Sequence, residues 1–212
     1  MSKFSNAIAQ SIRPAVSVLV VLTVLTGLAY PVLITGISQA LWPDKANGSL
    51  VQINDKAVGS RLIGQSFTNP AYLWGRPSAT STTPYNGQAS GGSNLGPLNP
   101  DLAKAVQDRI VALQKADPGN TASVPIDLVT TSGSGLDPEI SPAGAQYQVA
   151  RIARLRGLST EQVQGVILAH TQGPQAGLFG EPRVNVLQVN LALDQLAPIA
   201  AAPAAVVKTA QS

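Results

Sequence analysis

A long apolar stretch near the start of the chain is the strongest pattern in the sequence. No charged side chain occurs between Pro14 and Pro43, and Val, Leu and Ile dominate the residues between them. About 20 apolar residues are enough to cross the hydrocarbon core of a bilayer. Residues 14–41 therefore predict a transmembrane helix that follows a short N-terminal tail at 1–13.

Details of this stretch favour a retained anchor. Tyr30 and Trp42 lie toward its far end, where aromatic side chains favour the membrane interface. Pro31 is expected to kink or end the regular helix. The alternative is a cleaved signal peptide, because 38–40 (Ser-Gln-Ala) is an acceptable cleavage site. The apolar region is, however, longer than the ~7–15 residues of a signal peptide, so we expect it to stay as a membrane span.

Helical periodicity recurs three times in the region that follows. Asn99-Pro100-Asp101 predicts a helix start, and apolar residues continue at helical spacing to a stop at Asp117-Pro118-Gly119. A second helix is predicted from Ser141 to Gly157. A third begins at Ser159 with the capping-box pattern Ser-x-x-Gln and is expected to run to about Thr171.

Shorter apolar runs predict strands or extended segments. They occur at 50–53, at 61–67 and, with an irregularity, at 181–194. A polar stretch at 78–100 is long for a simple connection, which indicates a functional loop. The whole pattern predicts an α+β soluble domain at 44–196, attached to a single N-terminal transmembrane helix. The Ala/Pro-rich segment 197–212 has no periodicity and is expected to be a flexible tail.

Composition narrows the possible functions. The chain has no cysteine, so neither a disulfide framework nor a cysteine-based zinc cluster can form. Only 12% of residues are charged, and the net charge is +3. The helices at 141–157 and 159–171 imitate a helix-turn-helix, but the second of them has no basic residue before His170. We therefore expect no nucleic-acid partner, and a membrane-tethered DNA-binding regulator stays a minor alternative.

Several strings imitate catalytic motifs without completing them. Asp44-Lys45 starts like the phosphorylated loop of P-type ATPases but continues as Ala-Asn-Gly. The glycine-rich run at 87–93 lacks the Lys-Ser/Thr of a phosphate-binding loop. His170 is the only histidine, and no Gly-x-Ser-x-Gly string accompanies it. We expect no catalytic residue, no metal site and no tightly bound cofactor; the alternative is a membrane-tethered extracytoplasmic hydrolase that uses His170.

What remains is a set of polar, glycine-rich strings between the predicted elements. They are Gly64–Phe67, Arg76–Ser78, Ser90–Pro97, Asp127–Pro138 and Gly180–Val186. Much of each string is explained by turn chemistry, in which Asn and Ser side chains bond to neighbouring backbone. In this order behind one N-terminal span, however, the strings resemble the C subunit of the bacterial Kdp potassium-transporting ATPase. The resemblance runs from the anchor to about Asp194.

This resemblance implies a function. The family's complex contains a channel-like subunit that selects potassium and a P-type ATPase subunit that hydrolyses ATP. Its C subunit is a single-span accessory needed for assembly and activity, and is described as a catalytic chaperone that raises the ATP affinity of the ATPase subunit. The expected partners are thus those two subunits and membrane lipid, and ATP and potassium are handled by the complex. The sequence itself lacks a Thr-Val-Gly-Tyr-Gly filter and the phosphorylated loop.

Charge around the span favours one topology. Lys3 and Arg13 precede it, whereas Lys45 and Lys56 after it are offset by acidic neighbours. The positive-inside rule then predicts a cytoplasmic N-terminus in the bacterial inner membrane and a periplasmic soluble domain. Such a domain cannot touch cytoplasmic ATP, so an effect on ATP affinity has to travel through the membrane helices.

The glycine-rich strings also supply candidate interface residues. Glycines let backbone approach a partner closely, while Ser, Asn, Asp and Arg provide hydrogen-bonding groups. The candidates are Gln65, Ser93, Asn94, Ser132, Ser134, Asp137, His170, Glu181, Arg183 and Asn185.

Overall fold

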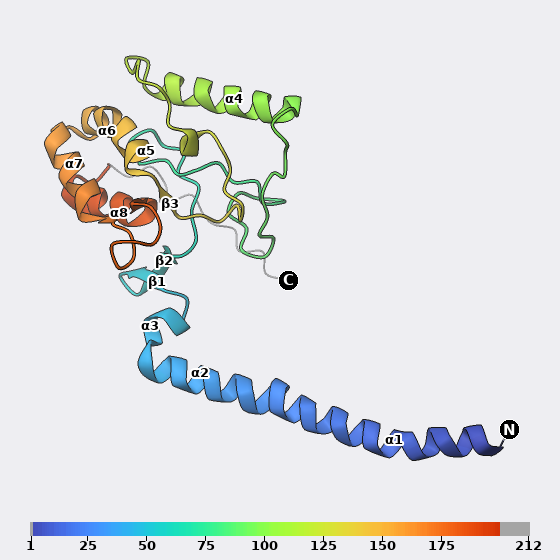
Figure 1. Ribbon diagram of the computed structural model, residues 1–212. Coiled ribbons are helices and arrows are strands. Elements are labelled where there is room, and N and C mark those ends of the chain that lie inside the picture. The colour runs from blue at the N-terminus through green and yellow to red at the C-terminus, as the bar shows by residue number, and fades with distance from the viewer. Residues whose placement is uncertain (1, 200–212) are drawn as a thin grey trace. The chain divides into compact units, whose positions relative to one another are not determined.

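The chain consists of two compact units in a computed structural model that describes residues 2–199 (Figure 1). The first unit is Met1–Leu50 and the second is Val51–Ser212. Most of the predicted tail lies outside the described part of the chain, since only residues 197–199 of it are described, and these follow the last helix without further regular structure.

The first unit is dominated by one long helical run. Helix α1 (Ser2–Thr23), the π-helical turn η1 (Val24–Ala29) and α2 (Tyr30–Leu41) follow one another directly, and the short α3 (Pro43–Ala46) comes after them. Residues 11–41 are long and apolar enough to cross a membrane, and their side chains are almost all exposed in the protein itself. This surface suits lipid. The chain therefore has a single N-terminal membrane-spanning helix among its described residues.

Pro31 widens this helix instead of ending it. Proline has no N–H, and its ring collides with the carbonyl four residues earlier in a regular helix. The π-helical turn lies directly before it, and the Tyr30 N–H bonds to the carbonyl of Leu25, five residues back. Nearby hydroxyls also find partners within the helix, because Thr26 Oγ1 donates to the Leu22 carbonyl at 2.7 Å. At Pro31 the helix therefore continues through a π-helical turn, where a kink or an end of the helix was expected.

The second unit combines five longer helices with two small sheets. Its helices are α4 (Pro100–Ala116), α5 (Pro142–Tyr147), α6 (Val149–Arg156), α7 (Thr160–Ala169) and α8 (Val186–Leu196), with a 3₁₀ turn η2 (Ile126–Leu128). Strands β1 (Leu50–Ile53) and β2 (Lys56–Ser60) pair with each other. The other sheet has the order β3-β5-β4 and is antiparallel, from β3 (Glu139–Ile140), β5 (Arg183–Asn185) and β4 (Thr171–Gln172). The predicted α+β class is confirmed.

The predicted helix starts are confirmed in detail. The Asn99 side chain accepts a hydrogen bond from the Asp101 N–H at the start of α4. Ser159 and Gln162 form the complete capping box of α7. The helix predicted from Ser141 to Gly157 is divided in two at Gln148, whose N–H bonds to the Ala145 carbonyl, three residues back, and whose side chain donates to the Trp74 carbonyl.

Neither 61–67 nor most of 181–194 forms a strand. Residues 61–67 are irregular, and the strand lies just before them at β2. The segment 181–194 has only three residues of strand and then becomes helix α8. Asn185 starts that helix by accepting a hydrogen bond from the Gln188 N–H, and its buried side chains follow helical spacing.

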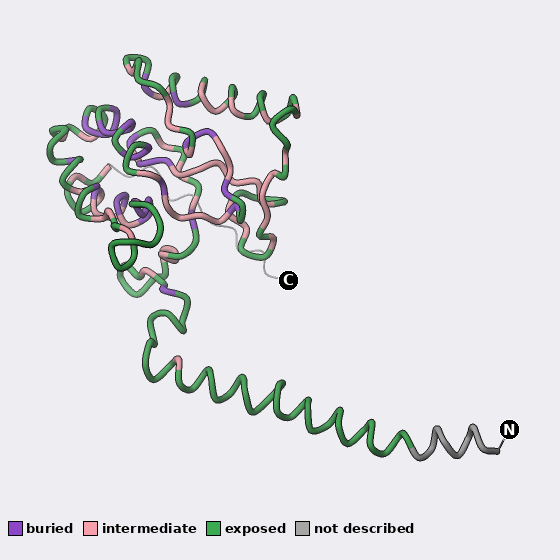
Figure 2. Tube along the Cα trace, in the orientation of Figure 1, coloured by how far each residue is buried: buried purple, intermediate pink, exposed green. Residues whose placement is uncertain are grey.

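An irregular segment, Asn69–Gly75, runs through the core beside the helices (Figure 2). Because it lacks secondary structure, its buried backbone groups are satisfied by side chains. Asn190 on α8 receives the Leu73 N–H at 2.7 Å and donates to the Leu73 carbonyl at 2.9 Å. Gln148 does the same for Trp74, at 2.9 and 3.0 Å.

Arginines complete this arrangement. The Arg151 guanidinium lies 4.8 Å from the Trp74 ring centroid and donates to the carbonyls of Pro70 and Tyr72. Burial lowers the pKa of Arg151 to about 10, so the group stays charged at neutral pH. Arg156 lies over the Tyr72 ring and bonds to the Ala71 carbonyl. Arg151 and Arg156 therefore stabilise the inner segment by bonding to its backbone carbonyls.

Candidate functional site

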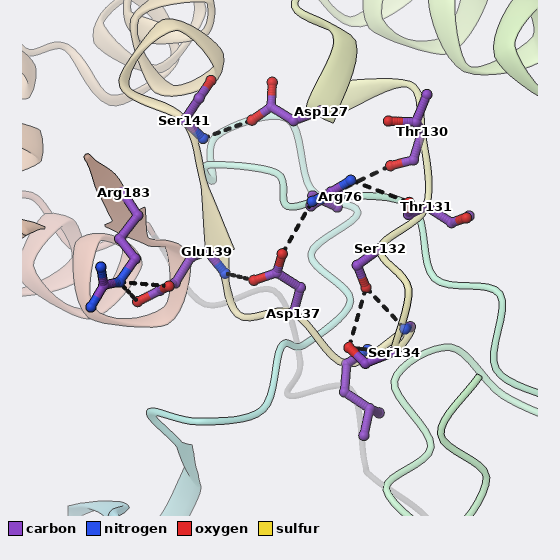
Figure 3. Close-up of polar contacts among 12 residues, drawn as sticks. Arg76, Asp127, Thr130, Thr131, Ser132, Ser134, Asp137, Glu139, Ser141 and Arg183 are labelled. Carbon is purple, nitrogen blue, oxygen red and sulfur yellow. Dashed lines mark hydrogen bonds and ion pairs between the residues drawn. The ribbon is translucent and has the colours of Figure 1, made fainter. Parts of the chain in front are cut away.

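Three of the glycine-rich strings meet in one place, which we call the loop cluster: residues 76–78, 90–93 and 130–137. Figure 3 shows Arg76 together with the 130–137 loop. The 130–137 loop is joined to each of the other two by hydrogen bonds between residues that are 44 to 57 positions apart in sequence. This loop lies between the 3₁₀ turn η2 and strand β3, where Leu128 and Ile140 are buried in the core.

Arg76 is the centre of the loop cluster. Its Nη1 forms an ion pair with Asp137 Oδ2 at 3.2 Å, and its Nη2 donates to the Thr131 carbonyl at 3.2 Å. Asp137 Oδ1 in turn accepts the N–H of Glu139 at 3.0 Å, at the start of β3. A single guanidinium thus fixes the path of the chain into the sheet.

Serines fold the 132–137 loop onto itself and onto its neighbours. Ser132 Oγ accepts the Gly135 N–H at 2.9 Å, and Ser134 Oγ accepts the Leu136 N–H at 3.1 Å. The Ser134 carbonyl receives the Gly91 N–H at 2.8 Å. These are the local turn bonds that such residues prefer.

Close backbone approach makes glycine necessary here. Gly135 has φ +67°, and a Cβ on it would lie 2.6 Å from the carbonyl oxygen of Gly91. A Cβ on Gly64 would lie 2.6 Å from the Asp137 carbonyl oxygen. Side chains at these two positions would push the loops apart.

The loop cluster continues into the β3-β5-β4 sheet through an ion pair. Arg183 Nε lies 3.1 Å from Glu139 Oε1 and 3.0 Å from Oε2, and Arg183 Nη2 donates to Gln172 Oε1 at 3.2 Å. Burial raises the pKa of the Glu139 carboxyl, while the nearby Arg183 charge opposes that rise. The pair therefore spans all three strands of the sheet.

The structure gives most of the predicted interface residues internal partners. Gln65 donates to the Val58 carbonyl, Ser93 accepts from Thr131, and the buried Asn185 donates to the Arg61 carbonyl. Ser132, Ser134, Asp137 and Arg183 belong to the bonds above. Asn94 and Glu181 are exposed, and within the described residues their side chains make no hydrogen bond or ion pair.

His170 does not form a catalytic group with its surroundings. It is the C-cap of α7, half-buried, and its imidazole has no hydrogen-bond partner among the described residues. A catalytic imidazole needs an acid or carbonyl to orient it and a nucleophile to activate. Nor do three His, Asp or Glu side chains gather in the described part of the chain as a possible metal site.

Two arginines at the centre of the fold were not anticipated. Arg76 lies within one of the glycine-rich strings but is not among the predicted interface residues. Arg109 on α4 donates to the Leu128 and Gly75 carbonyls at 3.0 and 2.9 Å. Arg109 lies between two shallow grooves of about 280 and 350 Å³. The scarcity of charged residues could have indicated their role. In a chain with only 12% charged residues, an arginine beside turn residues indicates an internal partner.

The described residues form a membrane-anchored protein, with one candidate span and a second unit whose loops are joined by hydrogen bonds. The family model described as "KdpC: K+-transporting ATPase, c chain" matches residues 12–195. The chain therefore belongs to the KdpC family, the c chain of the K⁺-transporting ATPase, and is a non-catalytic subunit of that complex.

Individual relatives agree. The potassium-transporting ATPase KdpC subunit of Variovorax paradoxus is 63% identical over 183 residues, covering 86% of this chain and 95% of the relative. That of Polaromonas naphthalenivorans is 60% identical over 188 residues, covering 89% and 96%. That of Methylococcus capsulatus is 58% identical over 184 residues, covering 87% and 97%. The likeness includes both the span and nearly all of the soluble domain.

Proposed function

We propose that this chain is an accessory, non-pore subunit of an ATP-driven, high-affinity potassium uptake complex, needed for its assembly and stability. The observation that carries the proposal is the family match over residues 12–195, which includes the membrane span as well as the soluble domain. The partners are a channel-like potassium-binding subunit and a P-type ATPase subunit. ATP and potassium are handled by the complex, and no cofactor binds tightly to this chain.

The partner-facing surface of the soluble domain lies at the edge of the loop cluster. Asn94 is exposed with an unpaired side chain, and Leu98, which follows in the same loop, is 96% exposed. A leucine so exposed beside polar groups suits a protein contact. The bonded members of the cluster, such as Arg76 and Ser132, hold this edge in shape, and Glu181 adds a second exposed polar contact.

The soluble domain lies on the periplasmic side of the bacterial inner membrane, and the N-terminus lies in the cytoplasm. Lys3 and Arg13 before the span support this topology. The chaperone-like effect on ATP affinity then passes through the span as a coupling free energy. Such couplings are typically ~1–3 kcal/mol, or about 5–150-fold in affinity.

Affinity purification tests this proposal. The chain is tagged after Ser212, purified in mild detergent from cells that carry the complete transport system, and the co-purifying chains are identified. A channel-like subunit and a P-type ATPase subunit are expected in equal amounts with it. As a control, the Pro14–Leu41 span is replaced by an unrelated apolar span. If the native chain purifies alone, the proposal fails.

A further inference from the structure

An ordered turn between β4 and β5 displays two large apolar side chains. Leu178 and Phe179 are 77% and 67% exposed. The turn is well bonded, with the Gln175 N–H on the Phe179 carbonyl at 2.7 Å and the Phe179 N–H on the Gln175 carbonyl at 2.9 Å. Ala176 and Gly177 both have positive φ, at 52° and 73°, which closes the turn tightly. Leu178 and Phe179 are therefore held outward by the backbone.

This apolar turn lies on the same side of the domain as the β1–β2 hairpin (Figure 1). The turn leads into β5, whose Asn185 donates to the carbonyl of Arg61 at 2.9 Å, one residue after β2. Figure 1 shows the loop before α8 on the same side of the domain as the hairpin, with α4 on the opposite side. Ile53 and Leu62 of the hairpin region are exposed as well, at 42% and 61%.

A short covalent tether links the membrane span to the β1–β2 hairpin. Trp42 follows the span directly, where aromatic rings mark the membrane interface. Only residues 42–50 separate the end of α2 from Val51, which is at most about 30 Å of extended chain, and four of them are helical. The start of the hairpin therefore lies within about 30 Å of the end of the span along the chain.

Charge near the turn is balanced. Lys56 and Arg61 carry positive charge, and Asp55 and Glu181 carry negative charge. Balanced charge gives this part of the domain no preference for an anionic lipid surface. Apolar side chains on a fixed turn suit the boundary between lipid headgroups and acyl chains.

We propose that Leu178 and Phe179 form a lipid contact that inserts into the membrane interface and orients the soluble domain on the bilayer. Ile53 and Leu62 extend the same apolar contact. The contact depends on apolar burial, so it forms on zwitterionic lipid and does not depend on salt.

Depth measurement on the full-length chain tests this proposal. The chain has no cysteine, so Phe179→Cys can be labelled with an environment-sensitive fluorophore. Val111→Cys is the matched control, because Val111 is 51% exposed on α4, on the side away from the hairpin. Each labelled chain is placed in phosphatidylcholine vesicles with and without lipids that carry a shallow nitroxide quencher, and a melting curve confirms that each variant is folded.

The proposal expects a blue-shifted emission and strong quenching at position 179, neither of them at position 111, and no change when salt is raised. Equal, water-like emission at both positions would overturn it. So would protection of position 179 that appears only when the other subunits are added, because the turn would then be a protein contact.

Discussion

At the residue scale, buried amide side chains replace the hydrogen bonds that secondary structure would give to Asn69–Gly75. The sequence could not reveal this, because Gln148 lies at the junction of two helices and Asn190 on a helix, where polar residues normally face water. Both are almost fully buried, at 1% exposed. Only the three-dimensional path of the inner segment shows why an amide is needed at each position.

Asn190→Ala should strongly destabilise the soluble domain. The change leaves the buried N–H and carbonyl of Leu73 without partners. At roughly 1–3 kcal/mol for each of the two unsatisfied groups, the free energy of unfolding should fall by about 2–6 kcal/mol. Denaturant unfolding of the full chain in detergent measures it. Asn94→Gly is the control, because Asn94 is exposed with φ 52° and should change stability by less than about 0.5 kcal/mol. Equal effects would show that the amide bonds are unimportant.

Arg183→Ala should destabilise the domain in a pH-dependent way. Removing the guanidinium leaves a partly buried Glu139 carboxylate unpaired and raises its pKa further. A carboxyl whose pKa is raised in the folded state costs stability once it ionises in the unfolded state, above its ordinary pKa of 4.5. The loss should therefore be small near pH 3.5 and approach about 1 kcal/mol at pH 7. Unfolding curves at several pH values measure it, and a pH-independent loss would contradict this role of the ion pair.

At the element scale, helix starts could be predicted and short strands could not. Asn99, Ser141 and Ser159 each cap a helix through a local hydrogen bond, so the sequence alone carries the signal. Strands of two or three residues depend on pairing with distant chain, as β3 and β4 do on β5. Asn185 and Asn190 made residues 181–194 look like an alternating strand, although one is a helix cap and the other a buried amide.

The membrane helix should contact partner helices near its π-turn. Gly27 lies in that turn, and a side chain added there meets nothing in this chain closer than Thr23 at 3.9 Å. Gly27→Leu should therefore preserve the helix but weaken assembly by blocking close approach of a partner. Recovery of the complex in mild detergent measures this.

Gly36→Leu is the control, because it adds the same side chain to open space on another face of the helix. Normal recovery with both variants would mean that the span serves only as a tether at this depth.

At the scale of the whole molecule, the account predicts one topology. Gln88 is exposed on a loop of the soluble domain, so Gln88→Cys should react with a membrane-impermeant thiol reagent in intact cells. Ser2→Cys should react only after the cells are opened. The reverse labelling pattern would place the domain in the cytoplasm and allow direct contact with ATP.

The anchor, the class of fold and the strings that meet in the loop cluster could be predicted from the sequence. Which of their polar residues bond internally and which stay exposed could not. Most of the candidate polar residues bond to each other, as Asp137 does through Arg76. Which side chains remain free depends on how segments more than forty residues apart meet. The local sequence pattern does not predict such long-range contacts. The exposed Asn94 and Leu98 emerge only from the folded chain.

The most direct test of the central claim is recovery of the transport complex with and without this chain. The channel-like and ATPase subunits are produced together in a strain that lacks its own copy of this protein, and the tagged ATPase subunit is purified in mild detergent. With the chain present, we predict an intact complex and growth at limiting potassium; without it, the complex should fall apart and growth should fail. Full recovery of the complex and of growth without the chain would contradict its role as a required accessory subunit.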